Sequence, residues 1–146
     1  ARPERAAIEV IKDYSTLPLV ECCAGQLNQV FMNILTNAID ALEEVVDSGQ
    51  RVVNKQDSLS STITIRTAYV DTHWVEIAIA DNGSGIPQDI QQRIFDPFFT
   101  TKPKGTGIGL SICKQLIEMY GGQIKVDSEV QVGTSVIVTL PWVCDK

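Results

Sequence analysis

The chain has 146 residues, 44% hydrophobic and 21% charged, which is typical of one globular domain with its own core. With 12 Lys and Arg against 18 Asp and Glu, its net charge of −6 disfavours a duplex nucleic-acid binder, because such proteins carry basic surfaces. The only histidine is His73, so any site that needs two histidines, such as a zinc HExxH site, is excluded. We expect an anionic ligand to be held by local geometry, because the overall field repels it.

The four cysteines match neither a zinc pattern nor a disulfide framework, and we expect Cys22, Cys23, Cys113 and Cys144 to be small core-filling thiols in a reducing cytosol. No apolar run approaches the ~20 residues of a membrane span, and no charged-then-apolar leader opens the chain. The first residues, Ala1–Arg5, suggest a cut through a longer protein. The domain is therefore expected to be cytoplasmic, with membrane anchoring of its parent protein left open.

The first half of the chain predicts two strands, a long helix and a polar connection. Residues 8–14 and 17–23 are rich in β-formers and predict a hairpin. Apolar residues at three- and four-residue spacing then predict a helix over Gln26–Val46. The polar segment 47–61 predicts an exposed connection.

The second half predicts further strands and helices in alternation. In chain order these are strands Thr62–Val70 and Trp74–Asp81 with a turn at 71–72, a short helix Gln88–Ile94, a helix Ile108–Tyr120 ended by 121–122, and strands Gln123–Ser128 and Thr134–Leu140. Adjacent hairpins mixed with helices predict an α+β two-layer sandwich, in which about three helices cover one face of a mostly antiparallel mixed sheet.

Asn33 and Asn37 stand one turn apart on the first predicted helix, with Asp40 close to the same line. Asparagine is a mediocre helix former, and its amide oxygen is a hard ligand that suits Mg²⁺. Taken alone, the pattern is more typical of a solvated helix face.

Asp81-Asn82-Gly83-Ser84-Gly85 directly follows an apolar strand. A carboxylate delivered there can accept a hydrogen bond from an exocyclic amine such as adenine offers, and the glycines allow the backbone to approach a ligand. A plain turn explains the motif about equally well.

Gly105-Thr106-Gly107-Ile108-Gly109-Leu110 opens the last helix, where free backbone N–H groups make an anion site. The motif lacks the Gly-Lys-Ser/Thr ending of a Walker loop. A dinucleotide fingerprint, with Asp127 as the ribose acid, is disfavoured because residues 97–104 form no strand and position 110 is leucine.

The loop from Phe95 to Lys102 combines three phenylalanines with glycine and proline punctuation around it. Its aromatic side chains could pin a lid to the domain, and Lys102 and Lys104 could bring positive charge over a triphosphate. Taken alone, the segment is better explained by a structured loop whose aromatic side chains join the edge of the core and whose lysines are exposed.

In this order, the four motifs resemble the ATP-binding catalytic domain of sensor histidine kinases, in the superfamily that includes gyrase B, heat-shock chaperone and MutL ATPases. The resemblance covers nearly the whole chain, implies one domain over 1–146 with the Bergerat ATP-binding fold, and makes 86–106 a short ATP lid. The Phe-Phe-Thr-Thr-Lys run is similar to the nitrogen-regulation subgroup of these kinases.

The resemblance implies ATP and Mg²⁺ as cofactors and gives catalytic roles to Asn33, Asn37 and Lys102, with Asn37 as the metal ligand. Asp81 is the implied partner of the adenine amino group, and Thr134 helps to line the adenine pocket. The implied nucleotide-binding residues are Asn37, Asp81, Gly83, Gly85, Ile86, Phe95, Phe98, Thr101, Lys102, Gly105, Thr106, Gly107, Ile108, Gly109, Leu110 and Thr134.

Two positions depart from relatives in the superfamily. Where the ATPase branches generally carry a water-activating glutamate, this chain has Asn33, whose amide cannot act as a general base. Many kinases carry Lys or Arg where this chain has Asp40, so contact between Asp40 and phosphate is not expected.

The implied activity is donation of the ATP γ-phosphate to a histidine on a separate dimerisation and phosphoacceptor domain, expected N-terminal to residue 1. His73 lacks the surroundings of an acceptor histidine and is expected at a sheet edge. Partners would be that domain and, downstream, a response regulator receiver domain, with no nucleic acid. The fragment would be a monomer and the full-length protein a homodimer.

Two other functions remain as alternatives. An ATP hydrolase or ATP-driven clamp would be indicated by ATP turnover in the isolated domain, and Asn33 speaks against it. A binding-only module would be indicated by failure to bind ATP or ADP with magnesium.

Overall fold

The structure, a computed structural model, describes residues 8–15, 24–47, 61–71, 73–97, 99 and 109–141. The elements in these residues are β1 (Glu9–Asp13), α1 (Ala24–Asp47), β2 (Thr62–Tyr69), β3 (Trp74–Asp81), α2 (Gln88–Gln91), α3 (Gly109–Met119), β4 (Gln123–Glu129) and β5 (Gly133–Pro141). The predicted long helices and the last four strands are confirmed to within two residues at each end. The short helix α2 ends earlier than predicted, because the chain tightens into turns in which the Arg93 N–H bonds to the Ile90 carbonyl.

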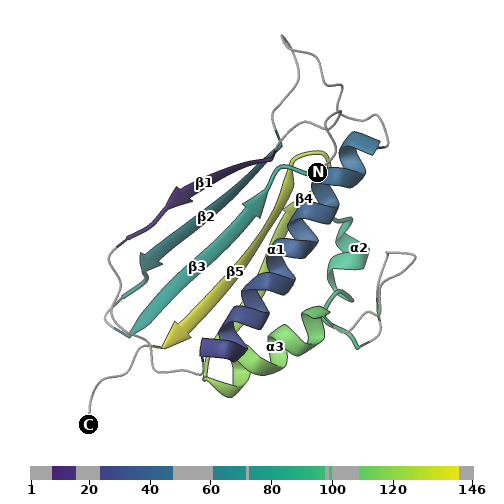
Figure 1. The fold of residues 1–146 in the computed structure, drawn as a ribbon. Helices are drawn as coiled ribbons and strands as arrows, with labels where there is room; N and C mark the ends of the chain where they lie inside the picture. Colours follow the sequence, from purple (N-terminus) through teal and green to yellow (C-terminus); the bar gives the residue numbers. More distant parts are fainter. Residues whose placement is uncertain are drawn as a thin grey trace.

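The five described strands form one sheet in the order β1-β2-β3-β5-β4 (Figure 1). Two hairpins, β2–β3 and β4–β5, supply antiparallel pairs, and β3 and β5 pair antiparallel at the centre. The predicted mixed, mostly antiparallel sheet is confirmed.

Strand β1 pairs in parallel with β2, with Glu9 opposite Thr62 and Asp13 opposite Arg66. A parallel pair needs a crossover connection, and here α1 lies between the two strands in the chain. The sequence prediction had paired this strand with 17–23, a segment outside the described residues.

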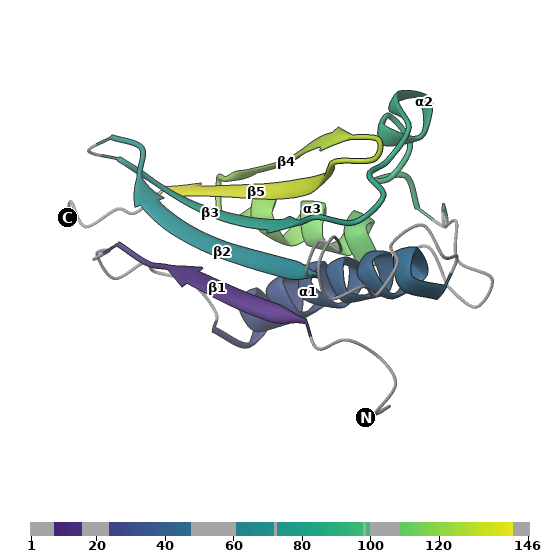
Figure 2. The same cartoon turned by 90° about the horizontal axis from the view of Figure 1, so that it is seen from above.

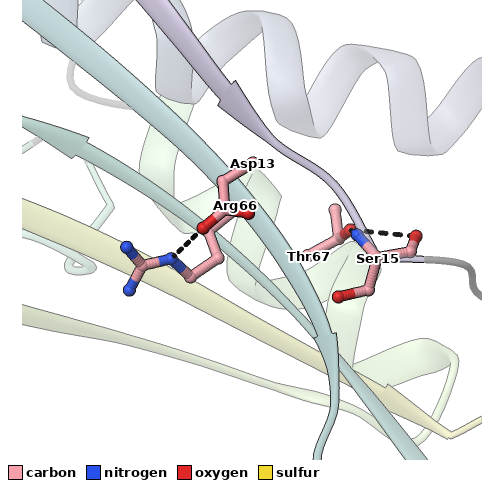
Figure 3. A network of polar contacts seen from close by, with 4 residues as sticks. All are labelled: Asp13, Ser15, Arg66 and Thr67. Atoms are coloured by element: carbon pink, nitrogen blue, oxygen red, sulfur yellow. Dashed lines mark hydrogen bonds and ion pairs between the residues drawn. The ribbon is translucent and has the colours of Figure 1, made fainter.

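Side chains reinforce the β1–β2 pair at its far end (Figure 3). Arg66 Nε donates to Asp13 Oδ2 at 3.1 Å, and the Ser15 N–H donates to Thr67 Oγ1 at 2.8 Å. The ion-pair side chains are 64% and 61% exposed, so solvent screening leaves them a contribution of about 0–1 kcal/mol.

Helices α1 and α3 lie on one face of the sheet (Figure 2). The apolar stripe that the sequence predicted for α1 is buried against strand residues and α3, and this confirms the two-layer α+β sandwich. The buried core residues are Val30, Ile34, Ala38, Leu42, Ile63, Val75, Ile79, Cys113, Ile117, Val138 and Leu140. Helix α2 is one turn long and contacts β4.

Among the described residues, no helix is both long enough and apolar enough to cross a membrane. The prediction that Cys113 is a core thiol is confirmed, since the residue is fully buried and unbridged. Cys22, Cys23 and Cys144 lie outside the described residues.

Candidate functional site

One face of α1 carries three residues at four-residue spacing: Asn33, Asn37 and Ala41. This spacing puts them in a line along the helix, about 6 Å apart in rise. The two ends of the line touch different parts of the predicted site, and Asn37 lies between them.

At one end of the line, Asn33 contacts the beginning of α3. Its Nδ2 donates to the Gly109 carbonyl at 3.5 Å and to Cys113 Sγ at 3.8 Å. The Cys113 thiol in turn donates to the Val30 carbonyl at 3.6 Å. The half-buried amide therefore holds the predicted anion-binding helix start against α1.

Burial raises the pKa of the Cys113 thiol above its ordinary value of 9.0, because a thiolate would lose its hydration there. The hydrogen bond from Asn33 lowers this pKa, but less than burial raises it. Near neutral pH, Cys113 therefore stays a protonated donor and not a reactive thiolate.

At the other end of the line, the loop after β3 packs on Ala41. Asp81 ends β3, and its Oδ1 accepts from the Gly83 N–H at 2.8 Å. A Cβ placed on Gly83 would stand 3.0 Å from Asp81 Oδ1 and 3.3 Å from the Ala41 Cβ. The buried Gly83 thus lets the loop that carries Asp81 lie close on α1.

Asn37 is half-buried on the same face of α1 and has an interaction partner of its own. Its position midway along the line places it between the start of α3 and the Asp81 loop. Asp40, one turn further along, is also half-buried and partnered.

Across the sheet, Asp81 belongs to a row of side chains on the helix-bearing face. It stands opposite Ile63 on β2 and Thr134 on β5, and Thr134 stands opposite Ser128 on β4. Directly opposite residues share a face, so the side chains of Asp81 and Thr134 start from neighbouring positions on it. The Ser128 and Thr134 hydroxyl oxygens are 2.8 Å apart.

Hydrogen bonds from residues that the sequence did not single out hold the loop 82–86 against the β4–β5 hairpin. The Ile86 N–H donates to Ser128 Oγ at 2.8 Å, and Gln91 Nε2 donates to the carbonyls of Ile86 at 2.7 Å and Ser128 at 3.1 Å. The Gln131 N–H donates to the Ser84 carbonyl at 2.7 Å. We name the loop, Ser128, Gln91 and Gln131 together the G1 clasp.

Gly85 has a φ of +80°, and a Cβ there would lie 2.2 Å from the Glu129 carbonyl oxygen. The sequence prediction gave this glycine a role in ligand approach, whereas the close neighbour in the structure is the β4–β5 hairpin. Ser128 was missed because it belongs to no motif. The sequence did carry one sign of its role. Ser128 is a polar residue on the same, inward-facing side of β4 as Ile124 and Val126.

The described start of the predicted lid is attached to α3. Lys114 Nζ lies 5.7 Å from the centroid of the half-buried Phe95 ring, and the Arg93 guanidinium stacks over Phe99 at 4.6 Å. Leu110 is half-buried in the first turn of α3. Seven predicted site residues lie outside the described residues: Phe98, Thr101, Lys102, Gly105, Thr106, Gly107 and Ile108.

His73 is exposed just before β3, and its backbone N–H donates to Asp71 Oδ1 at 2.7 Å. It stands at the end of the sheet where Val75 pairs with Leu140, whereas Asp81 ends β3 at the other end. His73 and the candidate site thus lie at opposite ends of β3.

In the described ranges, no three His, Cys, Asp or Glu side chains gather in a way that could hold a metal. The oxygens near the line on α1 are amide and carboxylate oxygens, the donor type that Mg²⁺ prefers. Mg²⁺ usually takes few protein ligands together with substrate phosphates, so this donor set fits a metal that arrives with a nucleotide.

The family described as "Histidine kinase-, DNA gyrase B-, and HSP90-like ATPase" matches residues 24–143. Sporulation kinase D of Bacillus subtilis (strain 168) is 37% identical over 123 residues, which are 84% of this chain and 21% of that protein. The adaptive-response sensory kinase SasA of Prochlorococcus marinus (strain MIT 9313) is 37% identical over 140 residues, 92% of this chain and 34% of that protein. The chain thus spans about a third of the length of these relatives or less.

Solved structures show the same fold. The mycobacterial sensor histidine kinase MprB has a TM-score of 0.73 at 26% identity, covering 92% of this chain and 82% of that one. The catalytic domain of histidine kinase ThkA has a TM-score of 0.72 at 31% identity, covering 92% and 79%. With the described site, these matches confirm the predicted resemblance to a sensor histidine kinase catalytic domain: the chain belongs to the histidine kinase-, DNA gyrase B- and HSP90-like ATPase family.

Proposed function

We propose that this chain binds Mg-ATP and donates the γ-phosphate to a histidine on a separate dimerisation and phosphoacceptor domain. The observation that carries the proposal is the line on α1. Asn37 lies between Asn33, which contacts the start of α3, and Ala41, which contacts the Asp81 loop. These two ends are about 12 Å apart in helix rise, a span suited to the phosphate and base ends of one nucleotide.

In this proposal each end of the line recognises a different part of the nucleotide. The start of α3 would offer backbone N–H groups to the phosphates, and the Asn37 amide oxygen would hold Mg²⁺. Asp81 would accept from the adenine amino group. When bound, Mg-ATP supplies the transferable phosphoryl group and the metal charge that offsets the charge on its oxygens.

Phosphotransfer is favoured over hydrolysis by what Asn33 does in the structure. Its Nδ2 donates to the Gly109 carbonyl at 3.5 Å. A glutamate could not donate there, and an amide cannot take a proton from water. At the position where a hydrolase needs a general base, this chain therefore carries the Asn33 amide, which binds the start of α3.

The names of similar proteins agree with this proposal. Several relatives at 37–38% identity are kinases, including the sensor kinase CckA of Brucella abortus (strain 2308). Full-length ShkA, with a TM-score of 0.76, was solved in complex with AMPPNP. By analogy, the partners would be the phosphoacceptor domain and then a response regulator receiver domain.

The test is a phosphotransfer assay with radiolabelled ATP, magnesium and the histidine-bearing hairpin domain of a related kinase. We expect acid-labile label on the hairpin, no label on this chain alone, and no transfer by Asn37→Ala. His73→Ala, which changes a residue at the other end of β3, should transfer at the wild-type rate. ATP turnover by the isolated chain without the hairpin would instead support the ATPase or clamp function.

A further inference from the structure

Ser128 is the centre of a small hydrogen-bond network that no sequence motif contains. Its Oγ accepts from the Ile86 N–H at 2.8 Å, lies 3.1 Å from the Gly133 carbonyl oxygen, and lies 2.8 Å from Thr134 Oγ1. These contacts link the Asp81 loop, through Ile86, to the two strands of the β4–β5 hairpin. They also join Ser128 to the only hydroxyl that stands directly opposite Asp81 in the β3–β5 ladder.

The number of hydrogens in this network is limited. A serine hydroxyl has one hydrogen to donate and two lone pairs to accept with. The Ile86 N–H takes one lone pair of Ser128. The Ser128 hydrogen can then point to Gly133 or to Thr134, and either hydroxyl can be the donor in the Ser128–Thr134 contact.

The two arrangements present different groups from Thr134. If Ser128 donates to the Gly133 carbonyl, Thr134 must donate to Ser128, and Thr134 can only accept from a ligand. If Ser128 rotates its hydrogen toward Thr134, the Thr134 hydrogen is released to donate to a ligand. A ring nitrogen that carries a lone pair, such as N1 of adenine, accepts such a donor, whereas N1 of guanine carries a hydrogen.

We propose that Ser128 is a positioning residue for base recognition: it holds Thr134 as a hydrogen-bond donor toward the adenine ring when nucleotide is bound. The proposal rests on the proposed function and adds a residue to that site. The switch needs only the rotation of two hydroxyls, so no bond breaks and no proton changes its atom. Ser128 acts through Thr134 and is not itself expected to touch the reacting phosphate.

The test compares ATP with 1-deaza-ATP, in which a C–H replaces ring N1. Dissociation constants for both are measured with magnesium by competition against a fluorescent ATP analogue. We expect the wild-type chain to prefer ATP by about fivefold to tenfold, the size of one hydrogen bond. Ser128→Ala should reduce this preference to about twofold or less, because no Ser128 hydrogen then holds the Thr134 hydroxyl with its own hydrogen toward the ring.

Four further variants separate positioning from structure. Thr134→Val should abolish the preference, and adding Ser128→Ala to it should change the preference no further. Ser128→Thr, which restores a hydroxyl, should keep it. Gln91→Leu removes two amide hydrogen bonds of the G1 clasp but leaves the Ser128–Thr134 pair, so it should keep the preference even if it weakens both ligands equally.

The outcomes separate this proposal from the proposed function. If Ser128→Ala weakens ATP and 1-deaza-ATP by the same factor, Ser128 is only structural and the proposal is wrong. If the wild-type chain binds both analogues equally, and Asp81→Asn weakens both, the nucleotide site stands and the Thr134 contact does not. If the wild-type chain binds neither analogue, both proposals fail together.

Discussion

The side chains of Asn33 and Asp81 both form hydrogen bonds within the protein. The Asn33 amide donates to the first residue of α3, and Asp81 Oδ1 accepts from the Gly83 N–H. Such internal hydrogen bonds hold a polar side chain in one orientation before a ligand binds, so less conformational entropy is lost on binding. At the scale of residues, single hydrogen bonds therefore orient the side chains of the candidate site.

Asp81→Asn tests the role of the second carboxylate oxygen. The variant keeps an amide oxygen that can accept from the Gly83 N–H, but it replaces the other oxygen with an NH₂ donor. We expect ATP affinity to fall by about tenfold or more, because a donor would face the adenine amino group, while the melting temperature changes little. Calorimetry with ATP and GTP checks this. Wild-type affinity of the variant for both nucleotides would show that Asp81 does not recognise the base.

Cys113 makes stability depend on alkaline pH. Its folded-state pKa is raised, so above the ordinary value of 9.0 the unfolded chain binds fewer protons than the folded chain. Stability from the neutral thiol is thus complete below that pH and is lost as pH rises toward the raised pKa. Denaturant unfolding of wild type and Cys113→Val at about pH 8 and pH 10 should show a larger loss for wild type. Equal losses would contradict the assignment.

Hydrogen bonds join α1 both to the start of α3, in the candidate site, and to the residue just after the end of α3, outside it. Tyr120 OH contacts Gln26 Oε1 far from Asp81, whereas Asn33 contacts Gly109. Tyr120→Phe should cost about 1 kcal/mol of stability without changing ATP affinity. Asn33→Ala should lower both stability and affinity. Unfolding and binding curves of the two variants check this, and equal ATP affinities would place Asn33 outside the site.

The G1 clasp depends on a glycine that admits no side chain. Gly85→Ala would put a Cβ 2.2 Å from a backbone oxygen at a positive φ, so the hairpin and loop must separate. We expect a loss of about 2–4 kcal/mol in the free energy of unfolding. Gly25→Ala is the matched control, since nothing lies within 4 Å of its Cβ, and it should be neutral or slightly stabilising. A fully stable Gly85→Ala protein would mean that the clasp is open in solution.

The elements were predictable where their pattern is local. Spacing of apolar residues predicted α1, and alternation predicted β2 to β5, because each pattern follows from burial of one face. The parallel pairing of β1 with β2 was not predicted, because the choice of a partner strand depends on the whole sheet. Ser128 and Gln91 were missed for a related reason: Ser128 bonds to Ile86, which is 42 residues away in the chain, and Gln91 bonds to Ser128, which is 37 residues away.

For the whole molecule, α1 connects the parts of the candidate site. It packs its apolar face on the sheet and offers Asn33, Asn37 and Ala41 to the start of α3 and the Asp81 loop. The motifs and their order could be read from the sequence, but their contacts with α1 could not. Those contacts need the crossover that puts α1 on one face of the sheet (Figure 2).

The most direct measurement is a calorimetric titration of ATP into the chain with magnesium and with a chelator. We predict binding of one nucleotide per chain that needs magnesium, is weakened about tenfold or more by Asn37→Ala, and is unchanged by Thr36→Ala on the exposed face of α1. Failure to bind ATP or ADP with magnesium, or equal affinity in the Asn37→Ala variant, would contradict the proposal that Asn37 lies at the centre of a nucleotide site.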